Sequence, residues 1–333
     1  METYQIDEHD TRVYPMGLTQ TDGGIHVSVA AAAKACSLLL FVREEGKNGR
    51  AAKYREAAAI PFPESGRTGN VWSMTLRGGD FSSLYYAFEA DHVRFSDPYG
   101  RSFVGREHWG RLSGAKTLLL SPVTEPEFDW QGDRPLHIPY ENCIVYRAHV
   151  RGLTKHASSR TEHRGTFRGV VDKISYLKEL GITTLELLPA VEFQEVMMPE
   201  QTEGNPYGNS EPTGRLNYWG YAKAGVFAPK ASYADSGTSP VTEFKYMVRE
   251  LHKAGLEVVP EFYFSGKEVP EFVLETVRFW VREYHVDGIH LTGYAPTELL
   301  AKDPYLADTK LWALSWNAEK PAPGTKKHLG EYN

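Results

Sequence analysis

The feature that most constrains the fold is a strand, helix, strand pattern that begins near residue 140. Residues 143–150 form a β-rich run, and the apolar residues Val170, Ile174, Leu177 and Leu180 then recur at helical spacing. This helical pattern stops at Gly181, and residues 182–188 again have the composition of a strand. The segment therefore predicts one βαβ unit.

The same unit then repeats. Thr242 is predicted to cap a helix that ends at Gly255, before a strand at residues 256–263. Pro270 is predicted to open the next helix, and a strand around Ile289 follows it. A short helix near residues 296–302 and a strand at residues 310–316 continue the pattern.

Repeated βα units with short connections indicate a parallel sheet, for which a (β/α)₈ TIM barrel is favoured over a doubly wound sheet. Only about five such strands are visible before Asn333, and nothing after Trp316 has the pattern of a further strand. The barrel is therefore expected to be incomplete, or to be the front part of a longer product. Its strand at residues 310–316 would then be an open edge available for self-association.

The first third of the chain has a different period. Short alternating or buried-type runs at residues 25–29, 37–42 and 71–76 are separated by glycine-rich turns, without a helical pattern. This indicates an immunoglobulin-like β-sandwich over residues 1–120. A proline-rich linker is expected at residues 121–139, followed by the barrel-type domain over residues 140–333.

Composition excludes several classes of partner. The formal net charge is -6, from 37 basic and 43 acidic residues, so nothing predicts the basic stripe that nucleic acid requires. A neutral polymer suits this balance better. The start of the chain has no apolar signal segment and no run approaches membrane-spanning length, so we expect a soluble, cytoplasmic protein without a membrane partner.

Cysteine and histidine usage predicts neither a metal nor a cofactor. Cys36 and Cys143 lie far apart in apolar runs, which indicates buried thiols, and no Cys/His cluster has ligand spacing.

Several long motifs occur in an order that resembles the pullulanase, isoamylase and glycogen-debranching branch of the α-amylase superfamily. They are YRAHVRGLT at residues 146–154, HRGTF at 163–167, YLKELGIT at 176–183 with ELLP at 186–189, and NYWGY at 217–221 with FAP at 227–229. The first domain resembles the glycogen-binding sandwich that precedes such barrels. The resemblance implies a malto-oligosaccharide or other α-glucan partner, with Trp219 and Tyr221 as a platform for a sugar ring.

The catalytic positions depart from that family. Retaining cleavage needs two carboxylates roughly 5 to 5.5 Å apart. The nucleophile strand, G-F-R-F-D in the family, is GIHLT at residues 288–292, which puts His290 in place of Arg and Thr292 in place of the nucleophilic Asp. The acid/base strand, A-E-x-W-D in the family, is ALSWN at 313–317, with Leu314 in place of Glu. A threonine needs a neighbouring base to act as nucleophile, and leucine has no proton to donate.

Other residues have a functional and a structural interpretation. Glu261 and His290 are both expected to point into the barrel and could form a new acid/base pair, although the geometry this requires is demanding. His149 could bind a sugar hydroxyl or be a satisfied core group, and the pair Arg147 and Arg151 is interpreted as solvated or ion-paired surface.

Three functions remain open from the sequence. The favoured one is an α-glucan-binding or regulatory homologue without the family's catalytic carboxylates, with the candidate substrate-binding residues Trp219, Tyr221, His149, Glu261 and His290. The alternative is an active hydrolase of α-1,6 or α-1,4 glucosidic bonds. The third is an interaction protein that retains only the scaffold.

Overall fold

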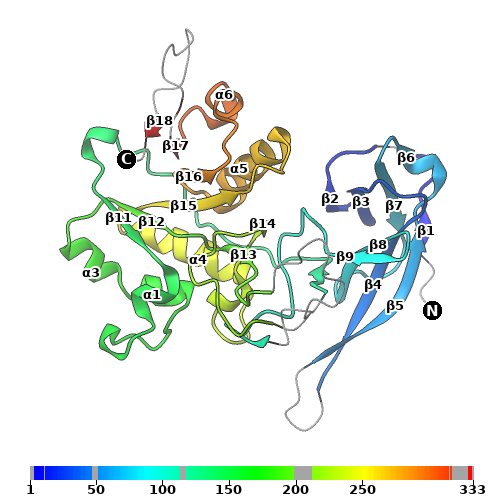
Figure 1. Ribbon diagram of the computed structural model, residues 1–333, viewed down its shortest axis with the longest axis horizontal. Coiled ribbons are helices and arrows are strands. Elements are labelled where there is room, and N and C mark those ends of the chain that lie inside the picture. Colours follow the sequence, from blue (N-terminus) through cyan, green and yellow to red (C-terminus); the bar gives the residue numbers. More distant parts are fainter. Residues whose placement is uncertain are drawn as a thin grey trace. The chain divides into compact units, whose positions relative to one another are not determined.

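The computed structural model describes residues 4–10, 12–46, 52–112, 118–198, 212–314, 316 and 329–331. The chain divides into two compact units, which the colour bar of residue numbers in Figure 1 helps to find. The first comprises residues 1–106 and 116–126, and the second comprises residues 107–115 and 127–333. The predicted limits placed residues 107–115 in the sandwich and residues 121–139 in a linker. In the structure residues 107–115 and 127–139 belong to the second unit, and residues 121–126 belong to the first.

Unit 1 consists of two antiparallel sheets. The first has the order β1 (Gln5–Ile6), β7 (Val71–Arg77), β3 (Gly24–Ala30) and β2 (Gly17–Thr21), with β6 (Arg67–Thr68) also on β7. The second has the order β10 (Ser121–Pro122), β8 (Leu84–Ala90), β4 (Cys36–Glu44) and β5 (Lys53–Pro61), with β9 (Val93–Phe95) also on β8. The three runs predicted as strands lie in β3, β4 and β7.

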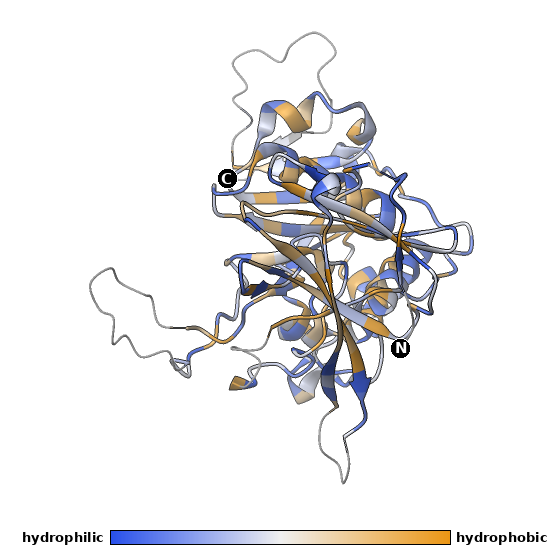
Figure 2. Ribbon diagram, turned by 90° about the vertical axis from the view of Figure 1, so that its right-hand side faces the viewer, coloured by the Kyte–Doolittle hydropathy of each residue, from blue (hydrophilic) through white to orange (hydrophobic). Residues whose placement is uncertain are grey.

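Side chains from both sheets of unit 1 form its larger apolar core, and a smaller cluster contains Leu39, Phe41, Ala87 and Leu120. Val27, Leu38, Leu76 and Phe88 are fully buried in the larger core, and Trp72 packs there as well. Alternation along the strands produces this core, since every second side chain of a half-buried strand points inward. Orange and blue residues are correspondingly interleaved along the strands in Figure 2.

Unit 2 contains a six-stranded parallel sheet whose strand order follows the chain order. The strands are β11 (Val145–Ala148), β12 (Thr184–Leu187), β15 (Glu257–Phe264), β16 (Gly288–Gly293), β17 (Lys310–Ala313) and β18 (Leu329–Glu331). Within the described residues no pairing joins β18 back to β11, so this is a barrel-type sheet without closure. The complete eight-stranded barrel remains a prediction.

The prediction that no strand follows Trp316 was wrong. β18 pairs in parallel with β17, so the β17 strand is not the edge of the sheet. Gly330 lies opposite Trp312, and a Cβ atom there would come within 2.6 Å of the Trp312 ring. The strand depends on a glycine that allows this close approach, which is a weak strand signal in a sequence.

The helices of unit 2 connect these strands, and a two-stranded antiparallel pair lies among them. The helices are α1 (Val150–Thr154), α2 (Phe167–Val171), α3 (Ile174–Glu179), α4 (Pro240–Lys253), α5 (Pro270–Tyr284) and α6 (Thr297–Ala301). The pair is β13 (Val191–Phe193) with β14 (Ala224–Pro229). None of the helices in the described ranges has both the length and the apolarity needed to cross a membrane.

Two helix predictions need correction. Helix α4 is capped by Ser239, whose hydroxyl accepts a hydrogen bond from the Thr242 amide, and Pro240 occupies its first turn. Thr242 is therefore inside the helix. The predicted helix before Gly181 is split into α2 and α3, and Leu180 is exposed. The Pro270 start of α5 is confirmed.

Candidate functional site

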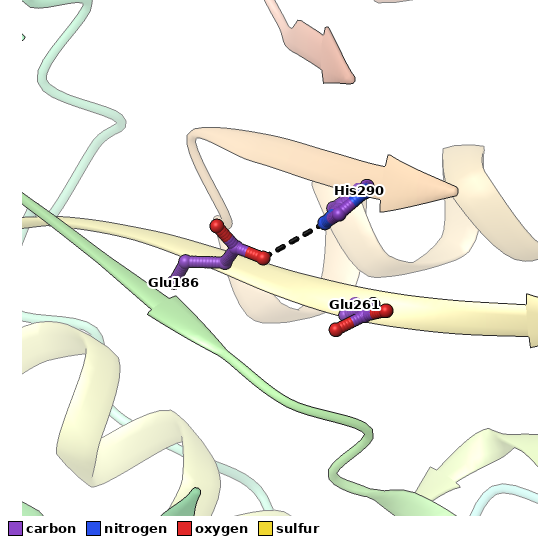
Figure 3. Close-up of side chains that lie close together, drawn as sticks. All are labelled: Glu186, Glu261 and His290. Carbon is purple, nitrogen blue, oxygen red and sulfur yellow. Dashed lines mark hydrogen bonds and ion pairs between the residues drawn. The ribbon is translucent and has the colours of Figure 1, made fainter. Parts of the chain in front are cut away.

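A cluster of ionisable side chains lies on four neighbouring strands of the parallel sheet. Arg147 belongs to β11, Glu186 to β12, Glu261 to β15 and His290 to β16. Strand register brings them together, because Arg147 is paired with Glu186 and Glu261 with His290 across adjacent strands. Figure 3 shows how Glu186, Glu261 and His290 converge from their three strands.

Arg147 connects the two carboxylates of the cluster. Its Nε lies 3.0 Å from Glu186 Oε1, and its Nη2 donates to Glu261 Oε2. The same Nη2 donates to the hydroxyl of Tyr221 at 2.8 Å. Burial lowers the pKa of Arg147, but the hydrogen bond and charge of Glu261 outweigh it and raise the pKa above its usual value. Arg147 is therefore a fixed positive charge between two carboxylates.

The carboxylates are buried and only partly hydrogen-bonded. Glu186 and Glu261 are fully inaccessible, and His290 is nearly so. His290 Nδ1 lies 2.8 Å from Glu186 Oε1. In the part of the chain that the structure describes, Glu186 Oε2 and Glu261 Oε1 are buried without a hydrogen-bond partner. An unsatisfied buried oxygen costs free energy, so its presence calls for a functional explanation.

The two positions where the resemblance places the family's catalytic carboxylates lie nearer the carboxyl ends of the strands. Thr292 is two residues beyond His290 on β16, and its hydroxyl donates to the Phe262 carbonyl at 3.1 Å. Leu314 directly follows β17, and its side chain is 81% exposed. In TIM-barrel proteins this end of the sheet carries the chemistry.

The aromatic segment at residues 217–221, before β14, has exposed rings that neighbouring side chains hold in place. Trp219 is 54% exposed and contacts Tyr218 edge to face, while the Tyr218 ring stacks on His149 at 4.2 Å. Tyr221 is 40% exposed and is held by Arg147. Burial, together with the charge of Glu261, raises the pKa of Tyr221 to about 12, so its hydroxyl stays protonated.

His149 is engaged entirely with protein groups. Its Nδ1 accepts a hydrogen bond from the Gly152 amide and caps α1, and its Nε2 lies 2.8 Å from the Tyr218 carbonyl. The hydroxyl of Tyr233 lies 3.1 Å from the same Nε2. These contacts fit the structural interpretation of His149, which positions the aromatic segment.

Arg147 is ion-paired, as one of its two interpretations had it, but its partners are buried carboxylates and not surface groups. Arg151 instead lies 4.8 Å over the ring of Trp109. Glu186 was also not predicted as part of the site, although Arg147 and Glu186 both lie inside the motifs that carry the family resemblance. Only the pairing of the strands shows that these motifs meet.

A metal-ligand group was likewise not predicted from spacing. Glu186, Glu261 and His290 each offer a ligand atom, and these atoms lie within 4.8 Å of one another. The three residues are far apart in the sequence, so no short motif could reveal them. The thiols contribute nothing to this group: Cys36 is buried, Cys143 is half-buried, and both are free.

Comparison with solved structures identifies the class of fold. The structure of a pullulanase from Paenibacillus barengoltzii, solved with maltohexaose and α-cyclodextrin, matches 98% of this chain and 60% of its own, with a TM-score of 0.70 and 18% identity. The Group B Streptococcus pullulanase matches 91% of this chain and 46% of its own, with a TM-score of 0.69 and 19% identity. The class is thus a pullulanase-like fold with a β-sandwich and a barrel-type α/β unit.

Sequence relatives place the chain more narrowly. Isoamylase 1 of Arabidopsis thaliana is 31% identical over 82% of this chain and 42% of its own length. A glycogen operon protein GlgX homologue of Mycobacterium tuberculosis is 28% identical over 91% of this chain and 52% of its own. The chain therefore belongs to the pullulanase, isoamylase and glycogen-debranching branch, as its motifs indicated. It spans about half the length of these relatives, and no family model matches it.

Proposed function

We propose that this chain binds α-glucan as a non-catalytic or regulatory protein of α-glucan metabolism. The observation that carries the proposal is the chemistry of Thr292 and Leu314 at the strand ends where the resemblance requires two carboxylates. The Thr292 hydroxyl donates to a backbone carbonyl. Its hydrogen-bond partners among the described residues include no side chain that could act as a base. Leu314 points an apolar side chain into solvent.

The buried carboxylates do not replace the missing pair. Glu186 and Glu261 are fully inaccessible, so in this arrangement a glucosidic oxygen does not reach them. Both also lie against the same guanidinium. A general acid or base must come within hydrogen-bond distance of the reacting atoms, which this burial prevents.

Exposed aromatic rings support the binding half of the proposal. Trp219 and Tyr221 present apolar faces to solvent, and sugars have C–H faces that aromatic rings cover. Tyr218 and Arg147 hold the two rings, so little conformational freedom is lost when a sugar binds. We expect an affinity for maltoheptaose near the millimolar range, on the order of -4 kcal/mol.

A titration with maltoheptaose, followed by tryptophan fluorescence and calorimetry, tests the binding. The double variant Trp219→Ala, Tyr221→Ala should lose the signal. Tyr305→Ala is the matched control, since Tyr305 is also an aromatic side chain that is half exposed. Tyr221→Phe keeps the ring and should retain affinity. Equal isotherms for wild type and the double variant would remove these rings from the site.

An activity assay tests the other half. Incubation with pullulan, glycogen or amylopectin should release no reducing sugar above the buffer control. Turnover that disappears in Glu261→Gln would contradict the proposal and support the alternative, a hydrolase with a rebuilt acid/base site. Binding without turnover is the expected result.

A further inference from the structure

We propose that Glu186, Glu261 and His290 bind a divalent transition-metal cation, with Arg147 as the competing positive charge. The inference is independent of glucan binding. It starts from three ligand atoms on three adjacent strands, all within 4.8 Å of one another (Figure 3). Because the ligands stand on a rigid sheet, their geometry is fixed before a cation arrives.

The second observation is the pair of unsatisfied carboxylate oxygens. Glu186 Oε2 and Glu261 Oε1 are buried and lack hydrogen-bond partners in the described part of the chain. Both side chains are fully inaccessible. Buried carboxylates in proteins are paired or coordinate metals, and here each carboxylate keeps one oxygen available.

The charge balance also favours a cation. Two carboxylates face one guanidinium, so the cluster carries one excess negative charge when the imidazole is neutral. The Arg147 bonds use Glu186 Oε1 and Glu261 Oε2, so one oxygen of each carboxylate lies outside the bonds to the guanidinium. A divalent cation supplies a compensating positive charge together with coordination bonds.

The donor set selects the kind of cation. One imidazole nitrogen and two carboxylate oxygens suit Zn²⁺ or Mn²⁺, whereas Ca²⁺ requires six to eight oxygen ligands. Three protein ligands leave a fourth position of Zn²⁺ open for water or another small ligand. We therefore expect Zn²⁺ to bind in preference to Ca²⁺.

Arg147 gives the proposal a test with a distinctive sign. A guanidinium beside the ligands repels an arriving cation, so Arg147→Gln should raise Zn²⁺ affinity, by about tenfold. Loss of the same arginine breaks ion pairs and should lower stability. Circular dichroism must show that Arg147→Gln is folded, because an unfolded chain exposes histidine and cysteine side chains that also bind Zn²⁺.

The experiment is a calorimetric titration of the chelator-treated full chain with Zn²⁺, and with Ca²⁺ as the comparison. Wild type should bind one Zn²⁺ per chain, and His290→Ala and Glu261→Gln should weaken binding at least about tenfold. His156→Ala, which removes an exposed histidine outside the cluster, is the control and should bind as wild type. Circular dichroism checks the fold of each variant.

Thermal unfolding provides an independent readout. Zn²⁺ should raise the melting temperature of wild type, because a ligand that binds only the folded state stabilises it. It should raise that of Arg147→Gln further, and leave His290→Ala unchanged. Three results would each overturn the site: no saturable Zn²⁺ binding to wild type, equal binding by wild type and His290→Ala, or weaker binding by a folded Arg147→Gln.

Discussion

Two glutamates on strand β15 have equal burial and unequal surroundings. Glu257 is the first residue of the strand and Glu261 lies four residues later on the same face, and both are fully inaccessible. Glu257 accepts hydrogen bonds from the Lys310 ammonium, the Ile138 amide and the Thr184 hydroxyl, so both of its oxygens are used. Glu261 leaves Oε1 without a partner among the described residues.

The difference separates two ends of one sheet. At the amino ends of the strands, buried charges are fully satisfied and stabilise the fold. Halfway toward the carboxyl ends, the cluster retains unused oxygens, and beyond it lie Thr292 and Leu314. This is the division expected of a barrel-type sheet, in which the amino-terminal face serves stability and the carboxyl-terminal face serves function.

The largest expected effect is on Glu257. Glu257→Gln should lower the free energy of unfolding by about 3–5 kcal/mol, because it leaves the buried Lys310 ammonium without a counter-charge. Urea unfolding followed by circular dichroism measures it. A loss below about 1 kcal/mol would show that this end of the sheet does not depend on the pair.

The His252 network is the second test of the amino end. His252 Nε2 lies 2.9 Å from Asp287 and its Nδ1 lies 3.0 Å from Asp133, which also contacts His285. Asp287 further accepts hydrogen bonds from the amides of Leu136 and Val258, which fits a structural role. Burial lowers the pKa of His252, but its bonds to Asp287 and the two nearby aspartate charges outweigh this and raise it.

The raised pKa sets the direction of a pH effect. The folded state holds the His252 proton more tightly than the unfolded state, whose value is near 6.5. The stabilisation is therefore complete below pH 6.5 and is lost as pH rises through the folded pKa. His252→Gln should remove this slope and cost about 1.5–3 kcal/mol at low pH. Unfolding curves from pH 6.5 to 9 measure both.

Asp97, in the sandwich, titrates at a lower pH than the range used to test His252. Burial raises the pKa of Asp97 from 3.8 to about 6, against the hydrogen bond from Tyr86 that lowers it. The folded state holds the Asp97 proton more tightly than the unfolded state does. The stabilisation from Asp97 therefore decreases as the pH rises from about 4 to about 6. A stability slope above pH 6.5 that persists in His252→Gln would contradict the assignment to His252.

Glu261 should behave differently from Glu257. Glu261→Gln is expected to change the free energy of unfolding by less than about 1 kcal/mol, because it removes the excess negative charge while Arg147 keeps Glu186 as a partner. Parallel urea titrations of the two Gln variants provide the comparison. Equal destabilisation would mean that both glutamates serve the fold and would break the distinction between the two ends.

The local elements of the sheet were accessible from the sequence, and the cluster was accessible only in part. Helix α5 could be predicted because Pro270 starts it and Val273, Val277 and Trp280 recur on one face. Glu261 and His290 were expected to point into the barrel. Arg147 was missed because its partners come from β12 and β15, and the pairing of those strands is a long-range property that no local pattern contains.

The smallest effect is expected at Leu314, which tests whether the carboxyl end is free of folding constraints. The side chain is 81% exposed, so Leu314→Glu buries no charge and removes little packing. Its effect on the free energy of unfolding should lie within about 0.5 kcal/mol, as for other surface substitutions. Thermal and urea unfolding measure it, with Leu306→Glu as the contrasting variant, because Leu306 is fully buried. If Leu314→Glu were strongly destabilising, the leucine would be required by the fold. A neutral result would mean that the fold tolerates a carboxylate at the position where the resemblance places one, so stability does not account for the leucine.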